Sequence, residues 1–274
     1  MIVKSLFYYP IKSCKGIPLA KANLDQYGIE GDREYTLVAP DGTALTQREN
    51  ARLALVEPQL VDGILQATYP DRDPLLLEDP TKVEATVDLH GWQLPSVDMG
   101  DRAARWFTEA VGSSCRLAKS VGTWDFTDHK VYPEFEELSG ARIVEQSRFN
   151  PFPILIVNES SLADLRKRQS SQVSVERFRP NIVLEGADAY EEDHWRNLQI
   201  GSVRLDIAIP CERCPMINVD QDTAESSKEP LATLASYRRI EKGFATKVAF
   251  GSYAAVTDDG HLSCGDEASA RRTT

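Results

Sequence analysis

The stretch REYTLVAPDGTALTQR, residues 33–48, decides the fold class of this chain. Two runs rich in β-branched and aromatic side chains flank the pair Asp41-Gly42, and such a pair between two such runs is a strong signal for a β-hairpin. The same pattern returns around Asp62-Gly63, and residues 83–99 predict a third pair of strands. The first part of the chain is therefore expected to be mostly β.

Helices are few in the predicted secondary structure. Residues 100–112, GDRAARWFTEAVG, have an apolar stripe at helical spacing, and Asp101 is placed to cap this helix. Two more helices are expected over 159–169, which opens with serine caps, and over 229–240. Further strands are expected over residues 2–9, 151–157, 181–186 and 202–210, and a closing hairpin is expected over 246–264.

Many strands, few helices and frequent turns predict a mainly β chain of the α+β class with barrel-like architecture. The chain is expected to divide into a β-rich domain over 1–120, an acidic, loop-like linker or crossover over 121–150, and a second domain over 151–268. The tail, residues 269–274 within EASARRTT, is expected to be frayed because it is polar and terminal.

Composition and charge exclude several classes of protein. The 274 residues are 42% hydrophobic and 27% charged, as in ordinary globular proteins, and the net charge of −11 argues against nucleic acid as a main partner. The N-terminal apolar run is broken by Pro10, so we expect no signal peptide, and no stretch approaches the roughly 20 apolar residues that cross a bilayer. Five cysteines, an odd number, argue against a secreted disulfide framework. We expect a cytoplasmic protein with reduced thiols and no membrane partner.

The segment IPCERCPMINVD, residues 209–220, places two residues between Cys211 and Cys214. A structural zinc site needs about four ligands, and the other cysteines and the histidines are scattered along the chain. A redox dithiol normally lies between a strand and a helix, whereas MINVD is β-rich. Taken alone, the pair is best interpreted as two buried cysteines at the end of a strand. Arg213 between them favours a thiolate, because a neighbouring cation stabilises the charged form.

Basic side chains gather at the ends of several predicted strands. The run YPIKSCKG, residues 9–16, directly follows a strand, where side chains and backbone N–H groups can hold a phosphate. One interpretation is a single basic pocket in an acidic protein, and the alternative is a set of surface cations in weak salt bridges. The cations concerned are Lys12, Arg33, Arg177 and Arg179.

Together these stretches resemble a known family. The runs YPIKSCKGI, GDREYTLVAPDGTALTQRE, PFPILIVNESSLADL, RFRPNIVLEG, IPCERCPMINVDQDT, KEPLATLASYRR and FGSY follow one another over nearly the whole chain. They are similar to those of MOSC-domain proteins with an N-terminal MOSC β-barrel domain, in the branch of the mitochondrial amidoxime-reducing component and its bacterial relatives. The resemblance implies a MOSC N-terminal β-rich domain over 1–120 and a MOSC β-barrel domain over 151–268, with a cofactor site between them.

The resemblance also implies a molybdenum cofactor (Mo-molybdopterin), a pyranopterin dithiolene with a terminal phosphate. Cys214 matches the molybdenum ligand of the family, and thiolate suits such a soft site, so Cys211 becomes its neighbour. Asp220 matches an acidic residue near the metal, although a role as a turn former fits it equally. The positions that match cofactor contacts of the family are Lys12, Ser13, Arg33, Asn150, Arg179, Glu212, Arg213 and Tyr253.

The implied activity is that of an oxidoreductase that reduces N-hydroxylated substrates. Its electrons are expected from a separate ferredoxin- or cytochrome-b5-like protein, because the sequence has no four-cysteine iron–sulfur run. The alternative is a cofactor or sulfur carrier of the cofactor-sulfurase type. Pyridoxal phosphate binding belongs to the large additional domain of those sulfurases, and we do not expect that domain in this chain. The sequence departs from the family in VDQDTAE, residues 219–225, where Gln221 and Ala224 replace a turn proline and glycine, so a looser loop is expected.

Overall fold

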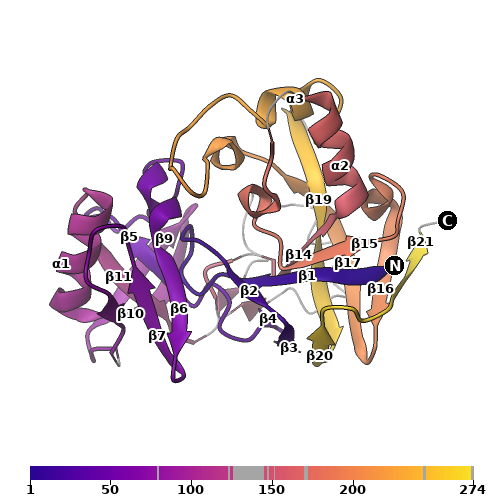
Figure 1. Ribbon diagram of the computed structural model, residues 1–274. Helices are drawn as coiled ribbons and strands as arrows, with labels where there is room; N and C mark the ends of the chain where they lie inside the picture. Colours follow the sequence, from indigo (N-terminus) through magenta and orange to yellow (C-terminus); the bar gives the residue numbers. More distant parts are fainter. Residues whose placement is uncertain are drawn as a thin grey trace.

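The computed structural model in Figure 1 describes residues 1–78, 80–122, 124–125, 145–146, 148–150, 152–169, 172–242 and 245–272. Strands dominate the regular structure of these residues, so the expected mainly β, α+β class is confirmed. In Figure 1, α1 and several short sheets lie at one end of the molecule, and α2 and α3 lie beside the largest sheet at the other end.

The largest sheet has nine strands and draws on both ends of the chain. Its inner strand β14 (Ile154–Asn158) is buried along its whole length and pairs in parallel with β15 (Ile182–Glu185). Burial on both faces explains why this segment is continuously apolar instead of alternating. The strand order is β2 (Ile17–Leu19), β1 (Ile2–Tyr8), β15, β14, β19 (Ala245–Asp258), β17 (Val203–Glu212), β16 (Trp195–Ile200) and β21 (Ala268–Arg272), and β18 (Arg239–Lys242) also pairs with β19.

Residues 268–272 belong to this sheet, so the expectation of a frayed tail is wrong for the described part of the tail, 269–272. β21 pairs with β16, and Arg272 forms an ion pair of 2.5 Å with Glu191. The Ala268 amide also donates to the Met1 carbonyl at 2.9 Å, which brings this end of the sheet beside the start of β1. Backbone hydrogen bonds hold the segment, and they do not require apolar side chains. The polarity of the tail was therefore a poor guide to its order.

The first half of the chain forms smaller sheets. A four-stranded sheet has the order β5 (Tyr35–Val38), β11 (Arg116–Ser120), β10 (Trp92–Asp98) and β9 (Glu84–Leu89). Two three-stranded sheets have the orders β6 (Glu57–Val61), β7 (Ile64–Thr68), β8 (Leu75–Leu76), and β20 (Gly260–Ser263), β3 (Lys21–Asp25), β4 (Gly28–Ile29). β12 (Trp124–Asp125) pairs with β13 (Glu145–Gln146), and most of the linker predicted over 121–150 lies outside the described residues.

Two of the three predicted hairpins form as expected. β6 and β7 flank Asp62-Gly63, whose φ values of 51° and 79° are those of the two-residue turn that such a pair favours. β9 and β10 flank a turn at His90-Gly91. At Asp41-Gly42 the turn closes, with the Ala39 amide donating to the Thr43 carbonyl at 2.9 Å. Its second arm makes two isolated bridges, Val38 with Ala44 and Thr43 with Asp88, and forms no regular strand.

The helices have caps other than those expected. In α1 the Asp98 carboxylate accepts from the Gly100 amide at 2.7 Å, and Asp101 does not cap. In α2 the side chain of Asn158 caps by accepting from the Ser160 amide at 3.1 Å, where serine caps were expected. α3 is shorter than expected because the end of the predicted helix forms β18. The described α-helices are α1 (Gly100–Val111), α2 (Glu159–Arg168) and α3 (Leu231–Ala235), and the described 3₁₀ helices are η1 (Ala51–Leu55), η3 (Val175–Phe178), η4 (Glu191–His194) and η5 (Pro215–Asn218).

An apolar layer joins the two halves of the chain. One core lies in the nine-stranded sheet, and another packs α1 against β5 and β11. Between them, Phe149 and Phe152 pack with Trp92 of β10 and Ala255 of β19. This layer packs the two halves of the chain against each other. Of the helices in the described parts of the chain, none combines the length and apolar character that a bilayer-spanning helix needs.

Candidate functional site

A buried tyrosine holds two arginine side chains from distant segments together. Tyr9, directly after β1, is fully buried, and the guanidinium groups of Arg33 and Arg179 each lie 4.3 Å from its ring centroid. An aromatic face attracts cations, which offsets part of the repulsion between them. Both arginines have positive φ, 51° and 56°, a conformation that costs a non-glycine residue roughly 1–2 kcal/mol. The fold therefore keeps both cations here at a cost in backbone energy.

The hydrogen bonds of Arg33 are made within the protein. Its guanidinium pairs with the buried carboxylate of Asp32. It also donates to Asn181 Oδ1 at 3.0 Å and to the Arg179 carbonyl at 3.2 Å. Asp32 is itself fixed, because it accepts from the Tyr9 amide at 2.7 Å. Arg33 can therefore act on a ligand mainly through its charge.

Arg179 differs, because one of its donors has no partner among the described residues. It is 6% exposed, and Nη1 donates to the Cys14 carbonyl at 2.5 Å, whereas the buried Nη2 donates to no described residue. Burial lowers the pKa of Arg179 to about 10. A buried, unpaired donor costs about 1–3 kcal/mol, and a bound anion would remove that cost. Arg179 is thus suited to bind an anionic group.

Lys12 lies in the field of these cations. Its Nζ donates to the Phe149 carbonyl at 3.1 Å. Burial is the main reason that the pKa of Lys12 falls to about 7. Cys214 acts in the opposite direction, which places its thiol within electrostatic range of Lys12. The charges that lower the pKa further are those of Arg33, Arg179 and Arg48.

The two cysteines of the pair have different environments. Cys211 is 1% exposed, and burial raises its pKa, an effect that Arg213 and a hydrogen bond with Tyr253 only partly offset. Cys214 is half-buried, carries a free thiol and occupies the N-cap position of η5. Among the described residues, no group of three or more His, Cys, Asp or Glu side chains is arranged to hold a metal ion. The accessible thiol of the pair is therefore that of Cys214.

The side chain of Asp220 shapes a turn. Its Oδ1 accepts from the amides of Asp222 and Thr223, each at 3.0 Å, and its Oδ2 accepts from Arg177 at 2.6 Å. Burial acts to raise the pKa of Asp220, but these hydrogen bonds and the Arg177 charge outweigh it and hold the pKa below its usual range. The structure shows the turn-forming role, and a role of Asp220 near the metal stays a prediction. Arg177 pairs with this loop and does not join the arginines at Tyr9.

Arg213 and Glu212 fix the end of β17. Arg213 donates to the Phe178 carbonyl at 2.9 Å and, through two nitrogens, to the Phe250 carbonyl at 2.8 and 2.6 Å. Glu212 lies 3.9 Å from Lys247 Nζ in a long ion pair. These contacts fix the backbone directly before Cys214. A contact of either residue with a cofactor stays a prediction.

Asn150 and Tyr253 both contact Phe152. Asn150 donates to the Phe152 carbonyl, and the Tyr253 ring stacks on the Phe152 ring with centroids 4.3 Å apart. Phe149, next to Asn150, supplies the carbonyl that holds Lys12. Both predicted residues therefore support the segment that holds Lys12, and their direct contact with a cofactor stays a prediction.

Sequence reasoning missed several residues of the cluster. Arg48 acts on Lys12 through its charge, and its Nη2 lies 3.5 Å from His90 Nε2. Burial, followed by the charges of Lys12 and Arg48, lowers the pKa of His90 to about 4, so its ring is neutral at pH 7. Asp32 and Asn181 stand inside the motifs GDRE and FRPN, close to an arginine in each. That adjacency is the signal that points to them, since a buried cation needs a carboxylate or amide partner.

The 219–225 loop is held more firmly than the loss of proline and glycine predicts. Gln221 is 3% exposed, and its amide forms hydrogen bonds with the amide of Gln47. Lys15 Nζ also lies 2.8 Å from the carboxylate of Asp222. The expected loosening is therefore not what the structure shows.

Ala224→Gly is expected to raise the free energy of unfolding by about 0.5–1 kcal/mol. Ala224 has a φ of 58°, and glycine removes the Cβ strain of this left-handed conformation but adds entropy to the unfolded chain. Urea denaturation measures the change. Ala20→Gly is the matched control, because Ala20 is exposed and lacks positive φ, and it is expected to lower stability. Equal effects of the two changes would contradict strain at Ala224.

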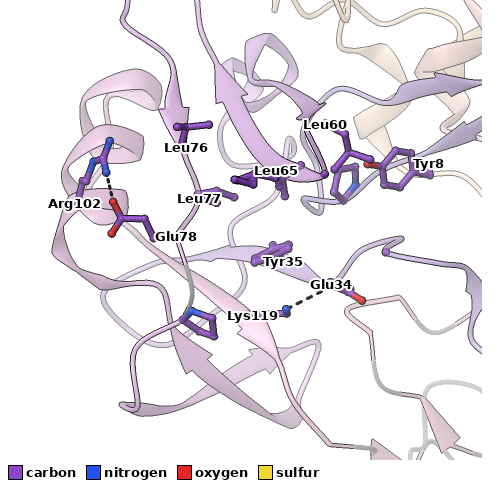
Figure 2. A pocket seen from close by; sticks show the side chains of 15 residues that line it. Tyr8, Glu34, Tyr35, Leu60, Leu65, Leu76, Leu77, Glu78, Arg102 and Lys119 are labelled. Atoms are coloured by element: carbon purple, nitrogen blue, oxygen red, sulfur yellow. Dashed lines mark hydrogen bonds and ion pairs between the residues drawn. The ribbon is translucent and has the colours of Figure 1, made fainter.

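A separate pocket of about 630 Å³ opens in the first half of the chain, and Figure 2 shows its lining. Leu65, Leu77 and Tyr35 supply apolar surface, and the ion pair of 3.9 Å between Lys119 and Glu34 lies beside them. None of the predicted site residues lines this pocket. It is therefore distinct from the cationic cluster.

Comparison with known proteins agrees with the resemblance. The sequence matches the family described as "MOSC N-terminal beta barrel domain" over residues 1–114 and the "MOSC domain" family over residues 147–269. It is 34% identical to mitochondrial amidoxime reducing component 2 of Rattus norvegicus and 33% identical to mitochondrial amidoxime-reducing component 1 of Homo sapiens, each over 96% of this chain and 81% of the relative. A molybdenum cofactor sulfurase of Oryza sativa subsp. japonica is 35% identical over 91% of this chain and 32% of its own length. The chain therefore belongs to the family of proteins that join a MOSC N-terminal β-barrel domain to a MOSC domain.

Proposed function

We propose that this protein binds a molybdenum cofactor and uses it to reduce N-hydroxylated substrates such as amidoximes. The observation that carries the proposal is the buried Nη2 of Arg179, which has no described acceptor and lies in a cluster with Arg33 and Lys12. The chain has a net charge of −11, so a cluster of buried cations is unusual in it and is explained by a bound anion. The names of the relatives, amidoxime reducing components and a cofactor sulfurase, support molybdenum chemistry.

The residues fit an anionic cofactor that takes one sulfur ligand from the protein. Lys12, Ser13 and Arg179 would hold its phosphate or pterin, because they combine two cations with a hydroxyl and an unpaired donor. Arg33 would contribute charge, since the protein already takes its hydrogen bonds. Cys214 would bind the metal through Sγ, and thiolate sulfur suits such a soft centre.

When bound, the molybdenum centre supplies two-electron redox chemistry, and the protein supplies binding and orientation. Reduction of an N–OH group breaks the N–O bond, consumes two electrons and two protons, and releases water. The electrons come from a separate ferredoxin- or cytochrome-b5-like protein. Lys12 Nζ, with a pKa of about 7, gains and loses a proton near neutral pH, and an anion beside it would hold that proton more firmly. Burial of Tyr9 keeps water from one side of the arginines.

The direct test is to produce the protein in a host that makes the cofactor. Molybdenum and pterin per chain are measured first, and reduction of an aryl amidoxime by a supplied electron donor is measured next. We expect stoichiometric molybdenum and turnover. Absence of both metal and pterin would overturn the proposal, and metal without turnover would leave only the cofactor-binding part of it standing.

Lys12→Met is expected to speed loss of the cofactor by about 10- to 100-fold, because it removes a charged contact to the bound anion. The measurement is the molybdenum retained by each variant over time after gel filtration. Lys21→Met is the matched control, since Lys21 is an exposed lysine of β3. Equal retention by the two variants would show that Lys12 does not contact the cofactor.

A carrier of the cofactor or of its sulfur is the second candidate. The identity to the rice sulfurase, 35%, is as high as that to the amidoxime reducing components. In this role Cys214 would hold the cofactor for delivery or carry sulfur received from a persulfide donor. Molybdenum without turnover, or a mass increase of one sulfur atom on Cys214, would favour this role over the reductase.

A further inference from the structure

We propose that Gln47 and Gln221, called here the glutamine pair, position the two loops that flank the cofactor site. One is the 12–15 loop, which carries Lys12 and Ser13, and the other is the 219–225 loop, which follows Cys214. Gln47 lies in the segment that matches the N-terminal family, and Gln221 lies in the MOSC segment. The pair thus links the two halves of the chain. This inference rests on the proposed function only for the identity of the ligand.

The two amides form a closed set of hydrogen bonds in the interior. Gln47 is 2% exposed and Gln221 is 3% exposed. Gln47 Nε2 donates to Gln221 Oε1 at 3.0 Å, and Gln221 Nε2 donates back to Gln47 Oε1 at 3.1 Å. Gln47 Nε2 also donates to the Ser13 carbonyl at 2.8 Å, and Gln221 Nε2 to the Val219 carbonyl at 3.0 Å. Both N–H groups of each amide are therefore used.

This arrangement permits one orientation of each amide. If either amide turned over, its oxygen would face the carbonyl of Ser13 or Val219, and two acceptors cannot form a hydrogen bond. Loss of one glutamine would leave the other with a buried donor and acceptor unpaired, which is costly in a low-dielectric interior. The two loops are therefore coupled energetically as well as connected.

The 12–15 loop needs this support. Ser13 has a φ of 64°, which is unfavourable for a residue other than glycine. Its carbonyl is held by Gln47, and the next carbonyl, that of Cys14, is held by Arg179 at 2.5 Å. Two successive carbonyls are thus fixed by side chains from different segments. The backbone that carries Lys12 is thereby held in one conformation.

The 219–225 loop has a second, weaker link to the same region. Asp222 forms an ion pair of 2.8 Å with Lys15, but the Asp222 side chain is 74% exposed. Exposed pairs of this kind contribute little to stability. The buried glutamine pair is therefore the main link. At Gln221 the rigidity that a turn proline would give is replaced by hydrogen bonds to the other half of the chain.

Hydrogen–deuterium exchange of the cofactor-free protein tests the coupling. Amides in both loops are hydrogen-bonded and should exchange slowly, among them those of Lys15 and Asp220. Gln47→Met and Gln221→Met are each expected to speed exchange by about tenfold or more in both loops. The informative result is faster exchange in the 12–15 loop of Gln221→Met, because a purely local role of Gln221 would not reach that loop. Gln59→Met, at an exposed glutamine of β6, is the matched control.

The double variant keeps the test decisive if a single variant folds poorly. It removes both buried amides, so coupling predicts exchange no faster than in the faster single variant. Exchange in the 12–15 loop of Gln221→Met that equals that of Gln59→Met, or multiplication of the two single effects in the double variant, would overturn the proposal. In the loaded protein, either single change should also speed molybdenum loss by about tenfold. If the unmodified protein binds neither molybdenum nor pterin, the proposed function fails while the exchange experiment still decides on the glutamine pair.

Discussion

Cys214→Ser is expected to reduce molybdenum-dependent turnover by more than about 100-fold. Loss of residues that only support the ligands of a metal lowers metal affinity or activity by about 10–100-fold, and loss of a ligand itself should cost more. Serine offers a harder and less polarisable donor than thiolate, so the centre should be lost or altered. The fold should persist, since Cys214 is half-buried and its φ of −112° suits any residue. Molybdenum per chain, amidoxime reduction and circular dichroism measure these three expectations.

Cys211→Ser distinguishes a dithiol mechanism, which uses both cysteines, from metal ligation by Cys214 alone. Cys211 is buried, and its sulfur interacts with Tyr253, so its loss should affect packing and leave the metal in place. A dithiol mechanism would require both cysteines and would be indicated if the two variants lost turnover equally. Full turnover in a folded Cys214→Ser protein would contradict the ligand assignment altogether.

Local signals in the sequence were sufficient for much of the fold. A pair such as Asp62-Gly63 needs positive φ, so it specifies a turn whatever lies around it, and the strands beside it follow. Features that depend on distant partners were not predictable in this way. β21 forms because its backbone meets β16, and Arg239–Lys242 is a strand and not a helix because it meets β19. Neither pairing is encoded within the segment itself.

In the candidate site, too, some features could be predicted from the sequence and others could not. Its cations stand in short motifs, so the family resemblance could identify Lys12, Arg33 and Arg179 by position. Their arrangement around Tyr9 could not be predicted, because it joins residues far apart in sequence. The same holds for the glutamine pair, whose members are 174 residues apart. The family resemblance gave the position of Asp220, but it could not predict that both carboxylate oxygens are engaged, one in a turn and the other in an ion pair with Arg177.

The second large expected effect is a pH dependence of stability, and it comes from a buried carboxyl group outside the site. Glu192, in η4, is fully buried, and its Oε2 accepts from Ser161 Oγ at 2.9 Å and Asn158 Nδ2 at 3.2 Å. Its Oε1 has no hydrogen-bond partner among the described residues. Burial raises the pKa of Glu192 from 4.5 to about 7, and the hydrogen bond from Ser161 only partly opposes this. The folded protein therefore keeps this group protonated in a range where the unfolded chain ionises it.

The sign of the pH dependence follows from the proton balance. Below about pH 4.5 both states bind the proton, so the group causes no loss of stability. Between about pH 4.5 and 7 the folded state binds more protons than the unfolded state, so stability falls as pH rises. Above about pH 7 the loss is complete, and it amounts to about 3 kcal/mol at most.

Glu192→Gln is expected to remove this dependence and to leave the protein about 2–3 kcal/mol more stable than the unmodified protein at pH 8. Glutamine resembles the protonated carboxyl group in size and keeps an oxygen that accepts from Ser161 and Asn158, so the two proteins should be similar near pH 4.5. Urea denaturation across this range measures the difference. Glu191→Gln is the matched control: Arg272 holds the pKa of Glu191 below its usual range, so its loss should give no gain at pH 8. Parallel stability curves for the unmodified protein and Glu192→Gln would mean that folding does not raise the pKa of Glu192, and would contradict the prediction.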